Sequence, residues 1–328
     1  MNRREFVGSS LSAAAAAAPP SAQRAASEAD GNAGVTIVIE RHSDGRLNRD
    51  KVLAVVSPHS DDFTIFNGGL VAKLIDEGYK AYLIRVTNDD MAGPGSIGHT
   101  VLANEEDKNR LVRLFGFAGS FDLNYPNHNM DNTSRAELKS RFIFLIRLLR
   151  VDTVISFSPW AHYEENPDHY VTATCVEAAC WMAGRDKDYP EHFAAGLKPH
   201  AVREKYYYGR WDPRSDLVID WTINRIVDIN PYVEKKVDAL IENRAQGPAG
   251  ENGARLRRRL AAQGLKLPLL GDDDDSANRA FIREFVLRFN RALGQRHGLA
   301  YAEPYFYIGP EPDIVEEYVR QHAVKQGG

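Results

Sequence analysis

Short apolar runs alternate with helical stripes along this chain from Lys51 onward, and this alternation constrains the fold more than any other feature of the sequence. The run Val52–Val56 is continuously apolar, which is typical of a strand buried on both faces. Further strands are predicted at 81–87 and 153–159, and the segments between the strands have helical spacing, first at 68–78 and then at 103–116 and 137–150. Strands that alternate with helices predict an α/β fold with a mostly parallel sheet and helices on both faces.

The later part of the chain is less regular. Strands are predicted at 204–211 and 225–229, and an amphipathic helix at 232–246. Residues 247–275 are rich in Gly, Arg and Asp and are predicted to form a surface insertion. The basic run at 255–260 is interpreted as a solvated helix face. The acidic run at 272–275 is interpreted as a helix start, where the helix dipole stabilises carboxylates.

Two polar segments stand at the carboxyl ends of strands in this predicted sheet. His59, Asp61 and Asp62 follow the first strand, and Asp168 and His169 follow the third. In open sheets of this Rossmann-like kind, ligands bind beyond the carboxyl ends of the strands, so the two segments can meet in space. Burying adjacent carboxylates costs several kcal/mol unless a positive charge compensates them. The sequence therefore predicts a metal ion, because a His, a carboxylate and a second His form a zinc-type ligand set with one open position.

These segments resemble the PIG-L deacetylase family, also called LmbE-like. The sequence Pro-His-Ser-Asp-Asp at 58–62, the pair Gly68-Gly69 and Asn-Pro-Asp-His at 166–169 are similar to the family's Pro-His-Pro-Asp-Asp, Gly-Gly and His-Pro-Asp-His. The loop after the second strand, the late helix that ends in Ala245-Gln246 and the closing strand resemble the family as well. The resemblance covers most of the chain from Lys51 to Phe306, apart from the insertion.

The resemblance implies a role for each matching residue. His59, Asp62 and His169 match the three metal ligands, and Asp61 matches the general base. Asp168 matches a carboxylate beside the last ligand that orients a neighbour. The implied metal is Zn²⁺, with another divalent ion as the alternative. In the implied reaction, water activated by the metal attacks an amide carbonyl, and Asp61 takes up the proton and returns it to the leaving amine.

Three positions depart from the family's pattern. Ser60 replaces a Pro, which concerns the backbone alone, and Phe63 replaces a common acidic residue and is expected to change the pocket wall. Asn166 replaces the first His of the last motif, which stabilises the oxyanion or donates a proton. An amide donates a hydrogen bond but is no acid, so Asn166 is predicted to keep only an electrostatic role in catalysis. His162 or Tyr163 is a candidate for the missing donor, with a polar loop over the site as the alternative.

Substrate contacts are predicted for polar and aromatic residues on the same side of the sheet. Asn127, His128 and Asp131 are candidates to bind a sugar, with an ordinary Asn- and Asp-rich turn as the alternative. His162 is a further candidate from the loop before the last motif. Trp160 is a candidate platform on which a sugar ring stacks.

The function implied by the resemblance is that of a hydrolase that removes an N-acetyl group from an amino sugar or glycoconjugate. Two alternatives stay open, namely an amidase for a larger acyl or thiol conjugate, and a non-catalytic protein that binds a metal or a sugar. The expected partner is a small molecule or glycan with an N-acetylated sugar. A net charge of −4 gives no reason to expect nucleic acid. The sequence does not indicate an oligomeric state.

The N-terminal segment resembles a twin-arginine export signal. Arg3-Arg4 precedes Phe6-Val7 and an Ala-rich run with small residues that offer cleavage sites. This run is too short and too weakly apolar for a stable membrane anchor. The predicted organisation is a signal peptide and disordered linker at 1–34 and a deacetylase domain at 35–328. The expected location is the periplasm or the exterior of the cell.

The two cysteines of the chain, Cys175 and Cys180, lie in a predicted helix. Residues five apart on a helix have Cα atoms about 8–9 Å apart. This separation exceeds what a disulfide tolerates. Both cysteines are therefore interpreted as small buried apolar residues.

Overall fold

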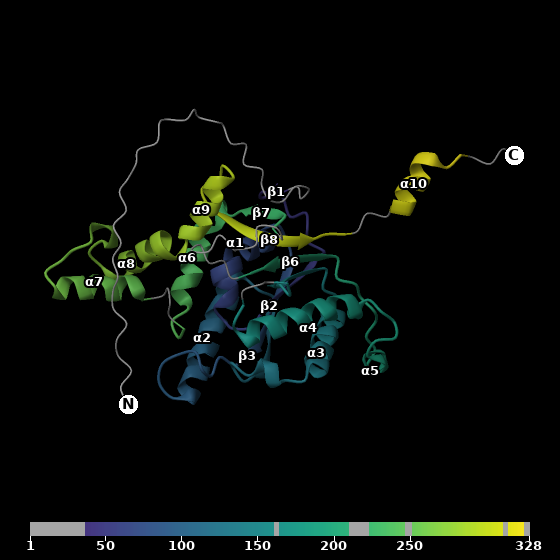
Figure 1. The fold of residues 1–328 in the computed structure, drawn as a ribbon, viewed down its shortest axis with the longest axis horizontal. Coiled ribbons are helices and arrows are strands. Elements are labelled where there is room, and N and C mark those ends of the chain that lie inside the picture. The colour runs from purple at the N-terminus through teal and green to yellow at the C-terminus, as the bar shows by residue number, and fades with distance from the viewer. Residues whose placement is uncertain (1–36, 161–163, 210–222, 247–250, 311–313, 325–328) are drawn as a thin grey trace, which may run out of the picture. The chain divides into compact units, whose positions relative to one another are not determined.

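Strands from both halves of the chain pair into one sheet in this computed structural model (Figure 1). The structure describes residues 37–160, 164–209, 223–246, 251–310 and 314–324. Within these residues the sheet has eight strands in the order β1-β7-β8-β6-β5-β2-β3-β4. The strands are β1 (Val38–Glu40), β2 (Val52–Ser57), β3 (Lys80–Thr87), β4 (Gly119–Tyr125), β5 (Thr153–Phe157), β6 (Glu204–Tyr208), β7 (Arg225–Asp228) and β8 (Ala302–Ile308).

The sheet is mostly parallel, as the alternation of strands and helices predicts. Strand β2 is an inner strand of the sheet and pairs in parallel with both β3 and β5. Only β8 runs antiparallel to its neighbours, β6 and β7, among the described strands. The edge strands β1 and β4 were not predicted from the sequence: β1 has only three residues, and β4 is only partly buried and has no continuous apolar run.

Helices cover both faces of the sheet, which confirms the predicted fold class (Figure 1). In the part of the chain that the structure describes they are α1 (Asp62–Asp76), α2 (Ile97–Phe115), α3 (Arg135–Leu149), α4 (Pro167–Ala183), α5 (Pro190–Ala194), α6 (Val233–Glu242), α7 (Asn252–Ala262), α8 (Asp274–Phe281), α9 (Arg288–Arg296) and α10 (Ile314–His322), together with the 3-10 turns η1 (Met130–Asn132), η3 (Asn230–Tyr232) and η4 (Pro268–Leu270) and the π-helical segment η5 (Ile282–Val286). None of the helices described here is both long and apolar enough to cross a bilayer.

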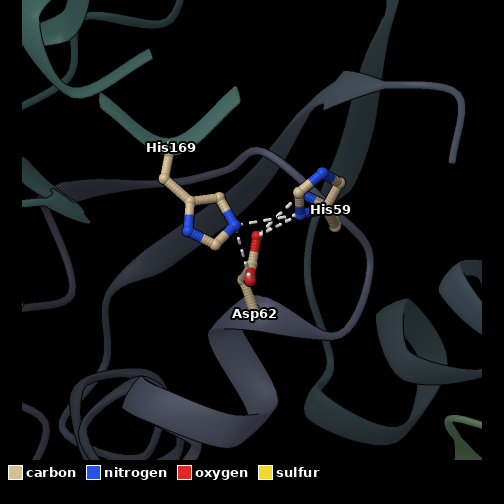
Figure 2. Close-up of side chains that lie close together, drawn as sticks. All are labelled: His59, Asp62 and His169. Atoms are coloured by element: carbon tan, nitrogen blue, oxygen red, sulfur yellow. Dashed lines mark hydrogen bonds and ion pairs between the residues drawn. The ribbon is translucent and has the colours of Figure 1, made fainter. Parts of the chain in front are cut away.

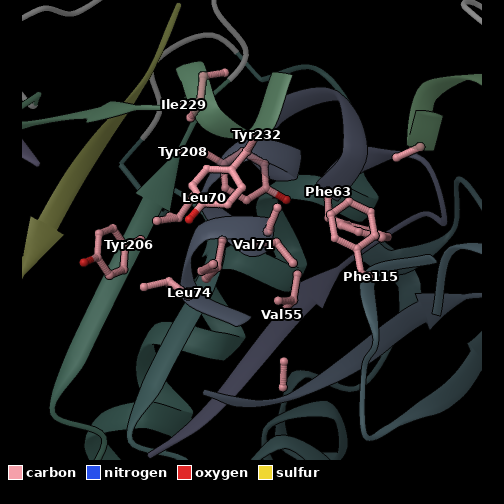
Figure 3. Close-up of a cluster of buried hydrophobic side chains, with 14 of the residues drawn as sticks. Val55, Phe63, Leu70, Val71, Leu74, Phe115, Tyr206, Tyr208, Ile229 and Tyr232 are labelled. Atoms are coloured by element: carbon pink, nitrogen blue, oxygen red, sulfur yellow. The ribbon is translucent and has the colours of Figure 1, made fainter. Parts of the chain in front are cut away.

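The inner strand β2 contributes to two separate cores because its side chains alternate between faces. Leu53 and Val55 pack into the core under α1, α2 and α6 (Figure 3). Ala54 and Val56 pack into the core under α3 and α4. All four side chains are buried. This two-sided burial explains why the run is apolar throughout, and it places the carboxyl end of β2 between helices from both layers.

Helices α1 and α2 begin earlier than the apolar periodicity predicts. Helix α1 starts at Asp62 instead of Gly68, and α2 starts at Ile97 instead of Ala103. The signal for α2 is Ser96, whose side chain accepts a hydrogen bond from the backbone N–H of His99 as an N-cap. For α1 the consequence is functional, because Asp62 is the first residue of the helix and not part of an extended loop.

The segment predicted as an insertion contains structure of its own. Helix α7 carries the basic run, and its arginine side chains are largely exposed, as predicted for a solvated face. Asp273 is the N-cap of α8 and accepts the backbone N–H of Ser276, which confirms the predicted helix start. A Cβ on Gly253 would lie 1.9 Å from the carbonyl oxygen of Ala277, so α7 and α8 pack closely at this glycine. Residues 247–250 lie outside the described residues.

Cys175 and Cys180 both lie in α4, are buried and form no disulfide. This confirms their interpretation as small apolar residues. Burial raises the pKa of the Cys180 thiol to about 12, so it is not a reactive thiolate.

The pair Gly68-Gly69 lets helix α1 approach β8 and α6. A Cβ on Gly69 would lie 2.4 Å from Cγ2 of Ile229, and a Cβ on Gly68 would lie 3.1 Å from Cγ of Lys236. At this contact the carboxylate of Glu303 accepts hydrogen bonds from the backbone N–H groups of Gly69 and Leu70 at 2.9 and 2.8 Å. Lys236 Nζ donates to the same buried carboxylate at 2.6 Å. The glycines therefore allow a buried ion pair to lie against the helix that carries Asp62.

The variant Gly69→Ala should reduce the free energy of unfolding by about 1–3 kcal/mol, because the new methyl group overlaps Ile229 and the backbone must shift. Gly98→Ala is the matched control, since this glycine is also helical but no atom lies within 4 Å of its Cβ position. The control should be neutral or stabilising by up to about 1 kcal/mol. Urea denaturation of both variants measures the difference, and equal effects would contradict the packing assigned to Gly69.

Candidate metal centre

The turn between β2 and α1 places the side chains of the first motif. Ser57 Oγ donates to the carbonyl oxygen of His59 at 2.6 Å, and the backbone N–H of His59 donates to Asp62 Oδ2 at 2.9 Å. Asp61 is the N-cap residue of α1, but its side chain makes no capping hydrogen bond. The turn therefore holds Asp62 against His59 and leaves the Asp61 carboxylate uncommitted to the helix.

A second loop supports this turn from the end of β3. Asp89 is fully buried in the left-handed backbone region at φ 58°, and its carboxylate accepts the backbone N–H of Ser60 at 3.2 Å. The Ser60 hydroxyl donates to Asn104 and accepts from Gln246. The replacement of Pro by Ser60 is thus more than a matter of backbone shape, because proline has no N–H for Asp89. The Gln246 of the Ala-Gln pair is part of the same contact.

His59, Asp62 and His169 converge at the carboxyl ends of β2 and β5, with their ligand atoms facing one another (Figure 2). His59 Nδ1 lies 3.1 Å from Asp62 Oδ2 and 3.1 Å from His169 Nε2. His169 Nε2 lies 3.4 Å from Asp62 Oδ1. Asp62 and His59 are buried, and only about an eighth of the His169 side chain is exposed. The structure therefore brings together the three residues that the sequence predicts as ligands.

His59 is oriented by polar groups on its other ring nitrogen. Nε2 lies 3.0 Å from Asp168 Oδ2 and 3.2 Å from Asn127 Oδ1, which are both acceptors. These partners assign the ring proton to Nε2 and leave the lone pair of Nδ1 for the cluster. Burial lowers the pKa of His59, but the Asp62 and Asp168 carboxylates outweigh burial and hold the pKa well above its ordinary value.

Asp168 is itself held firmly. Its carboxylate is fully buried and accepts the backbone N–H groups of His128 at 2.7 Å and Met130 at 3.3 Å. Burial raises the pKa of Asp168, but the hydrogen bonds from His59 and from these backbone groups lower it further than burial raises it. Asp168 therefore stays ionised beside His59, and the neighbour that it contacts is His59.

His169 is fixed by an aromatic ring and a second carboxylate. Its imidazole stacks on Phe157 with ring centroids 4.1 Å apart and planes at 18°. Its Nδ1 lies 3.0 Å from Glu164 Oε2. Burial lowers the pKa of His169, while Asp62 and Glu164 raise it above its ordinary value. Neither Phe157 nor Glu164 was predicted from the sequence, although Glu164 stands just before the last motif.

Asp61 is buried beside the cluster, and its pKa is raised to about 7. Burial is the largest cause, and the negative charge of Asp62 adds to it, while the charge of His59 opposes it. A carboxyl group with a pKa near neutrality can both accept and release a proton at ordinary pH. The pKa of Asp62 is instead lowered, because the attraction of His169 and His59 outweighs burial. The two adjacent aspartates therefore have different electrostatic environments.

Asn166 is the N-cap of α4. Its Oδ1 accepts the backbone N–H of Asp168 at 2.9 Å, and its Nδ2 lies 3.5 Å from His169 Nε2. The amide oxygen therefore begins the helix that carries Asp168 and His169, and the amide nitrogen borders the ligand cluster. This second position is compatible with the hydrogen-bond donor role predicted for Asn166.

The donor set fits a zinc-type ion. Two imidazole nitrogens and one carboxylate oxygen are ligands that zinc prefers. Tetrahedral ligands at about 2.0–2.1 Å from an ion lie roughly 3.3–3.4 Å from one another. The two histidine nitrogens lie 3.1 Å apart, and the nearest Asp62 oxygen to each is Oδ2 at 3.1 Å from His59 Nδ1 and Oδ1 at 3.4 Å from His169 Nε2, while one ligand atom from each residue lies within 4.8 Å of the other two. The cluster therefore has the size and the ligand types of a three-residue zinc site.

The predicted substrate residues do not share one environment. Asn127 is buried and contacts His59, so its position is that of a support for a ligand residue. His128 and Asp131 are exposed, and the backbone of His128 donates to Asp168. Trp160 is 42% exposed and packs edge-on against Tyr207 and Phe306. Sugar binding by these residues stays a prediction, and His162 and Tyr163 lie outside the described residues.

The expectation for Phe63 was wrong. Its side chain is fully buried in the core under α1 and packs against Phe115 and Phe117, with ring centroids 5.3 and 5.7 Å away (Figure 3). It therefore forms no pocket wall. The reason is the early start of α1, because Phe63 is the second residue of this helix and points towards α2.

Comparisons with known proteins agree with this arrangement. Residues 54–180 match the PIG-L family, described as GlcNAc-PI de-N-acetylase. The diacetylchitobiose deacetylase of Thermococcus kodakarensis is 26% identical over 205 residues, which are 62% of this chain and 72% of that protein.

Two solved structures share the fold. The N,N'-diacetylchitobiose deacetylase from Pyrococcus horikoshii has a TM-score of 0.60 and 21% identity, with 80% of this chain and 86% of that chain covered. The 4-carboxy-2-hydroxymuconate hydratase from Pseudomonas putida KT2440 has a TM-score of 0.54 and 16% identity, with 80% and 98% covered. Since proteins named for two different reactions share this fold, the fold alone does not fix the reaction.

Proposed function

We propose, on the premise that residues 54–180 match the PIG-L family, that the protein is a metal-dependent hydrolase that removes an N-acetyl group from an amino sugar or glycoconjugate. The observation that carries the proposal is the convergence of His59, Asp62 and His169 beside the uncommitted carboxylate of Asp61. The similarity to a diacetylchitobiose deacetylase supports an N-acetylated sugar as substrate.

The ion of this site is proposed to be zinc, held by His59 Nδ1, His169 Nε2 and a carboxylate oxygen of Asp62. When bound, it would supply Lewis acidity, which lowers the pKa of water and polarises the amide carbonyl. Two imidazoles and one carboxylate leave room for substrate and water.

Asp61 is proposed to move the proton in this reaction. Its carboxylate accepts a proton from the attacking water and later gives it to the leaving amine. In the metal-free protein, burial beside Asp62 raises the pKa of Asp61 to about 7, and a bound cation would lower that pKa and favour the ionised form that accepts the proton. Asn166 is proposed to donate a hydrogen bond to the developing oxyanion, because its amide nitrogen borders the cluster at 3.5 Å from His169 Nε2.

A non-catalytic role would not account for the buried carboxylate of Asp61. A protein that only holds a metal or a sugar has no need of a buried carboxylate beside the three ligands, since that carboxylate costs free energy to bury. An amidase for a larger acyl or thiol conjugate would use the same residues and differ only in the acyl group that it accepts.

The proposal is tested by incubating zinc-loaded protein with a panel of N-acetylated sugars and following release of free amine and acetate. The panel includes N-acetylglucosamine, diacetylchitobiose and N-acetylglucosaminyl phosphatidylinositol, beside N-acyl analogues with longer chains. Release of acetate from at least one member supports the proposal. Turnover confined to the longer acyl chains would favour the amidase, and no turnover with stoichiometric zinc would favour the binding protein.

We also propose that the protein is exported by the twin-arginine route, on the basis of Arg3-Arg4 and the Ala-rich run. These residues lie outside the described part of the chain. The double variant Arg3→Lys, Arg4→Lys should retain the protein in the cytoplasm with its N-terminal segment uncleaved. Cell fractionation and N-terminal sequencing of both forms measure this, and export of the variant at the wild-type level would contradict the route.

A further inference from the structure

The two histidines of the metal centre have matching environments on the sides that face away from the cluster. His59 presents Nδ1 to the cluster, and its Nε2 lies 3.0 Å from the carboxylate of Asp168. His169 presents Nε2 to the cluster, and its Nδ1 lies 3.0 Å from the carboxylate of Glu164. Asp168 belongs to the motif that the sequence resemblance covers, whereas Glu164 precedes that motif and has no role assigned so far.

Glu164 has the environment of a built contact and not of a surface charge. Only 4% of its side chain is exposed, against 12% for His169. Glu164 Oε2 and His169 Nδ1 are both buried, and neither makes a well-aligned hydrogen bond within the described residues, although the two atoms lie 3.0 Å apart. A buried acceptor and a buried donor that lack other partners each cost free energy, so the pair is best satisfied when they bond to each other.

The other oxygen of Glu164 fixes the loop that carries it. Oε1 accepts the backbone N–H of Asn166 at 3.0 Å, and Asn166 in turn caps α4. The carboxylate is therefore anchored at one oxygen and directed to the imidazole with the other. Phe157 constrains the His169 ring in a second way. The two rings stack with centroids 4.1 Å apart, and this stacking fixes the plane of the imidazole.

We infer that Glu164 is a positioning residue of the metal centre, which holds the proton of His169 on Nδ1 and so keeps Nε2 available as a ligand. This inference rests on the proposed function insofar as the cluster binds a metal, but it does not depend on the substrate. A carboxylate behind a ligating imidazole fixes the tautomer and the ring orientation and makes the ligand more basic. The chain then contains two carboxylate–histidine pairs, Asp168 with His59 and Glu164 with His169.

The test is direct measurement of zinc affinity by competition with a chromogenic chelator, for wild type and for three variants. Glu164→Gln keeps the length of the side chain and removes its charge. Glu164→Asp keeps the charge and can still accept the N–H of Asn166, since aspartate readily bonds a backbone N–H two residues on, but it is too short to reach His169 as well. Glu165→Gln is the matched control, because it removes the same charge from the exposed neighbouring residue.

Glu164→Gln and Glu164→Asp should weaken zinc binding about 10- to 100-fold, the usual effect of losing such a partner. Glu165→Gln should bind zinc within about threefold of wild type. Zinc affinity within threefold of wild type in Glu164→Gln would overturn the inference. If Glu164→Gln does not fold, as judged by the thermal unfolding of the metal-free protein, Glu164→Asp decides by the same criterion.

Two measurements distinguish a positioning role of Glu164 from a purely structural one, namely the unfolding temperature of the metal-free variant and the dependence of its turnover on zinc concentration. For a positioning residue, the unfolding temperature of the metal-free variant stays near that of wild type, and turnover on an active substrate recovers at saturating zinc. If the unfolding temperature falls while the zinc affinity of the folded protein is unchanged, the inference is wrong. Because zinc affinity is measured without substrate, failure of the proposed deacetylase activity leaves this result interpretable.

Discussion

Asp61→Asn should lower turnover about 100- to 10,000-fold and leave zinc content near that of the wild type, because the variant keeps size and shape but cannot accept a proton. Folding should be preserved, since Asp61 is the N-cap residue of α1 and asparagine is equally favoured there. Kinetics on an active N-acetylated sugar, beside metal analysis of the same preparation, measure both quantities. Near-normal turnover at saturating zinc would mean that another residue is the base.

Two further variants test whether the loss of turnover is specific to Asp61. Asp62→Asn should instead lower zinc affinity, and added zinc should restore part of the activity, because this carboxylate lies in the ligand cluster. Asp275→Asn makes the same chemical change at an exposed position of α8 and should leave both turnover and zinc content unchanged. A loss of activity in the control would show that the loss in Asp61→Asn is not specific.

Removal of a ligand histidine is the second large effect. His59→Ala and His169→Ala should each lose stoichiometric zinc on dialysis, because the remaining histidine and Asp62 offer only two ligand atoms where a catalytic zinc site uses three. A bound ion would stabilise transition-state charge by several kcal/mol, and so its loss should lower turnover by roughly 1000-fold or more. Elemental analysis of the dialysed proteins and a kinetic assay measure the two losses.

The control for this prediction is His322→Ala, which removes an exposed histidine from α10. It should retain zinc and turnover at wild-type levels. Zinc that persists at one ion per chain in both His59→Ala and His169→Ala would place the metal elsewhere in the protein. The assignment of the cluster would then be wrong, and with it the mechanism proposed for Asp61.

The sequence predicted a strand or helix correctly where the buried face of that element produces a regular pattern of apolar residues. Strand β2 is buried on both faces and reads as an unbroken apolar run, and α3 reads as a single apolar stripe. Strand β4 was not predicted, because it is a partly buried edge strand without a continuous apolar run. The starts of α1 and α2 were missed because regular apolar spacing begins only further along each helix. Ser96 caps the true start of α2, whereas the side chain of Asp61 makes no capping hydrogen bond at the start of α1.

The same distinction holds for the site. The two short polar motifs follow strands β2 and β5, which are neighbours in the parallel sheet, so their meeting was predictable from topology. The partners behind the histidines were not predictable. Asn127 was predicted only as a candidate to bind a sugar, and the contact of its amide oxygen with His59 Nε2 at 3.2 Å was not foreseen. Glu164 had no motif to mark it.

By itself the sequence predicted the mostly parallel α/β sheet from its periodicity and the grouping of His59, Asp62 and His169 from two short motifs, because period and motif are local properties that a chain carries in any conformation. Only the tertiary structure decided which side chains stand behind these residues. Asp168 lies 109 positions from His59 along the chain, and their contact at 3.0 Å exists only because β2 and β5 pair side by side. It likewise decided that Phe63 is core and that Ser60 is bonded to Asp89, since burial and the direction of a hydrogen bond depend on residues brought together from distant parts of the chain.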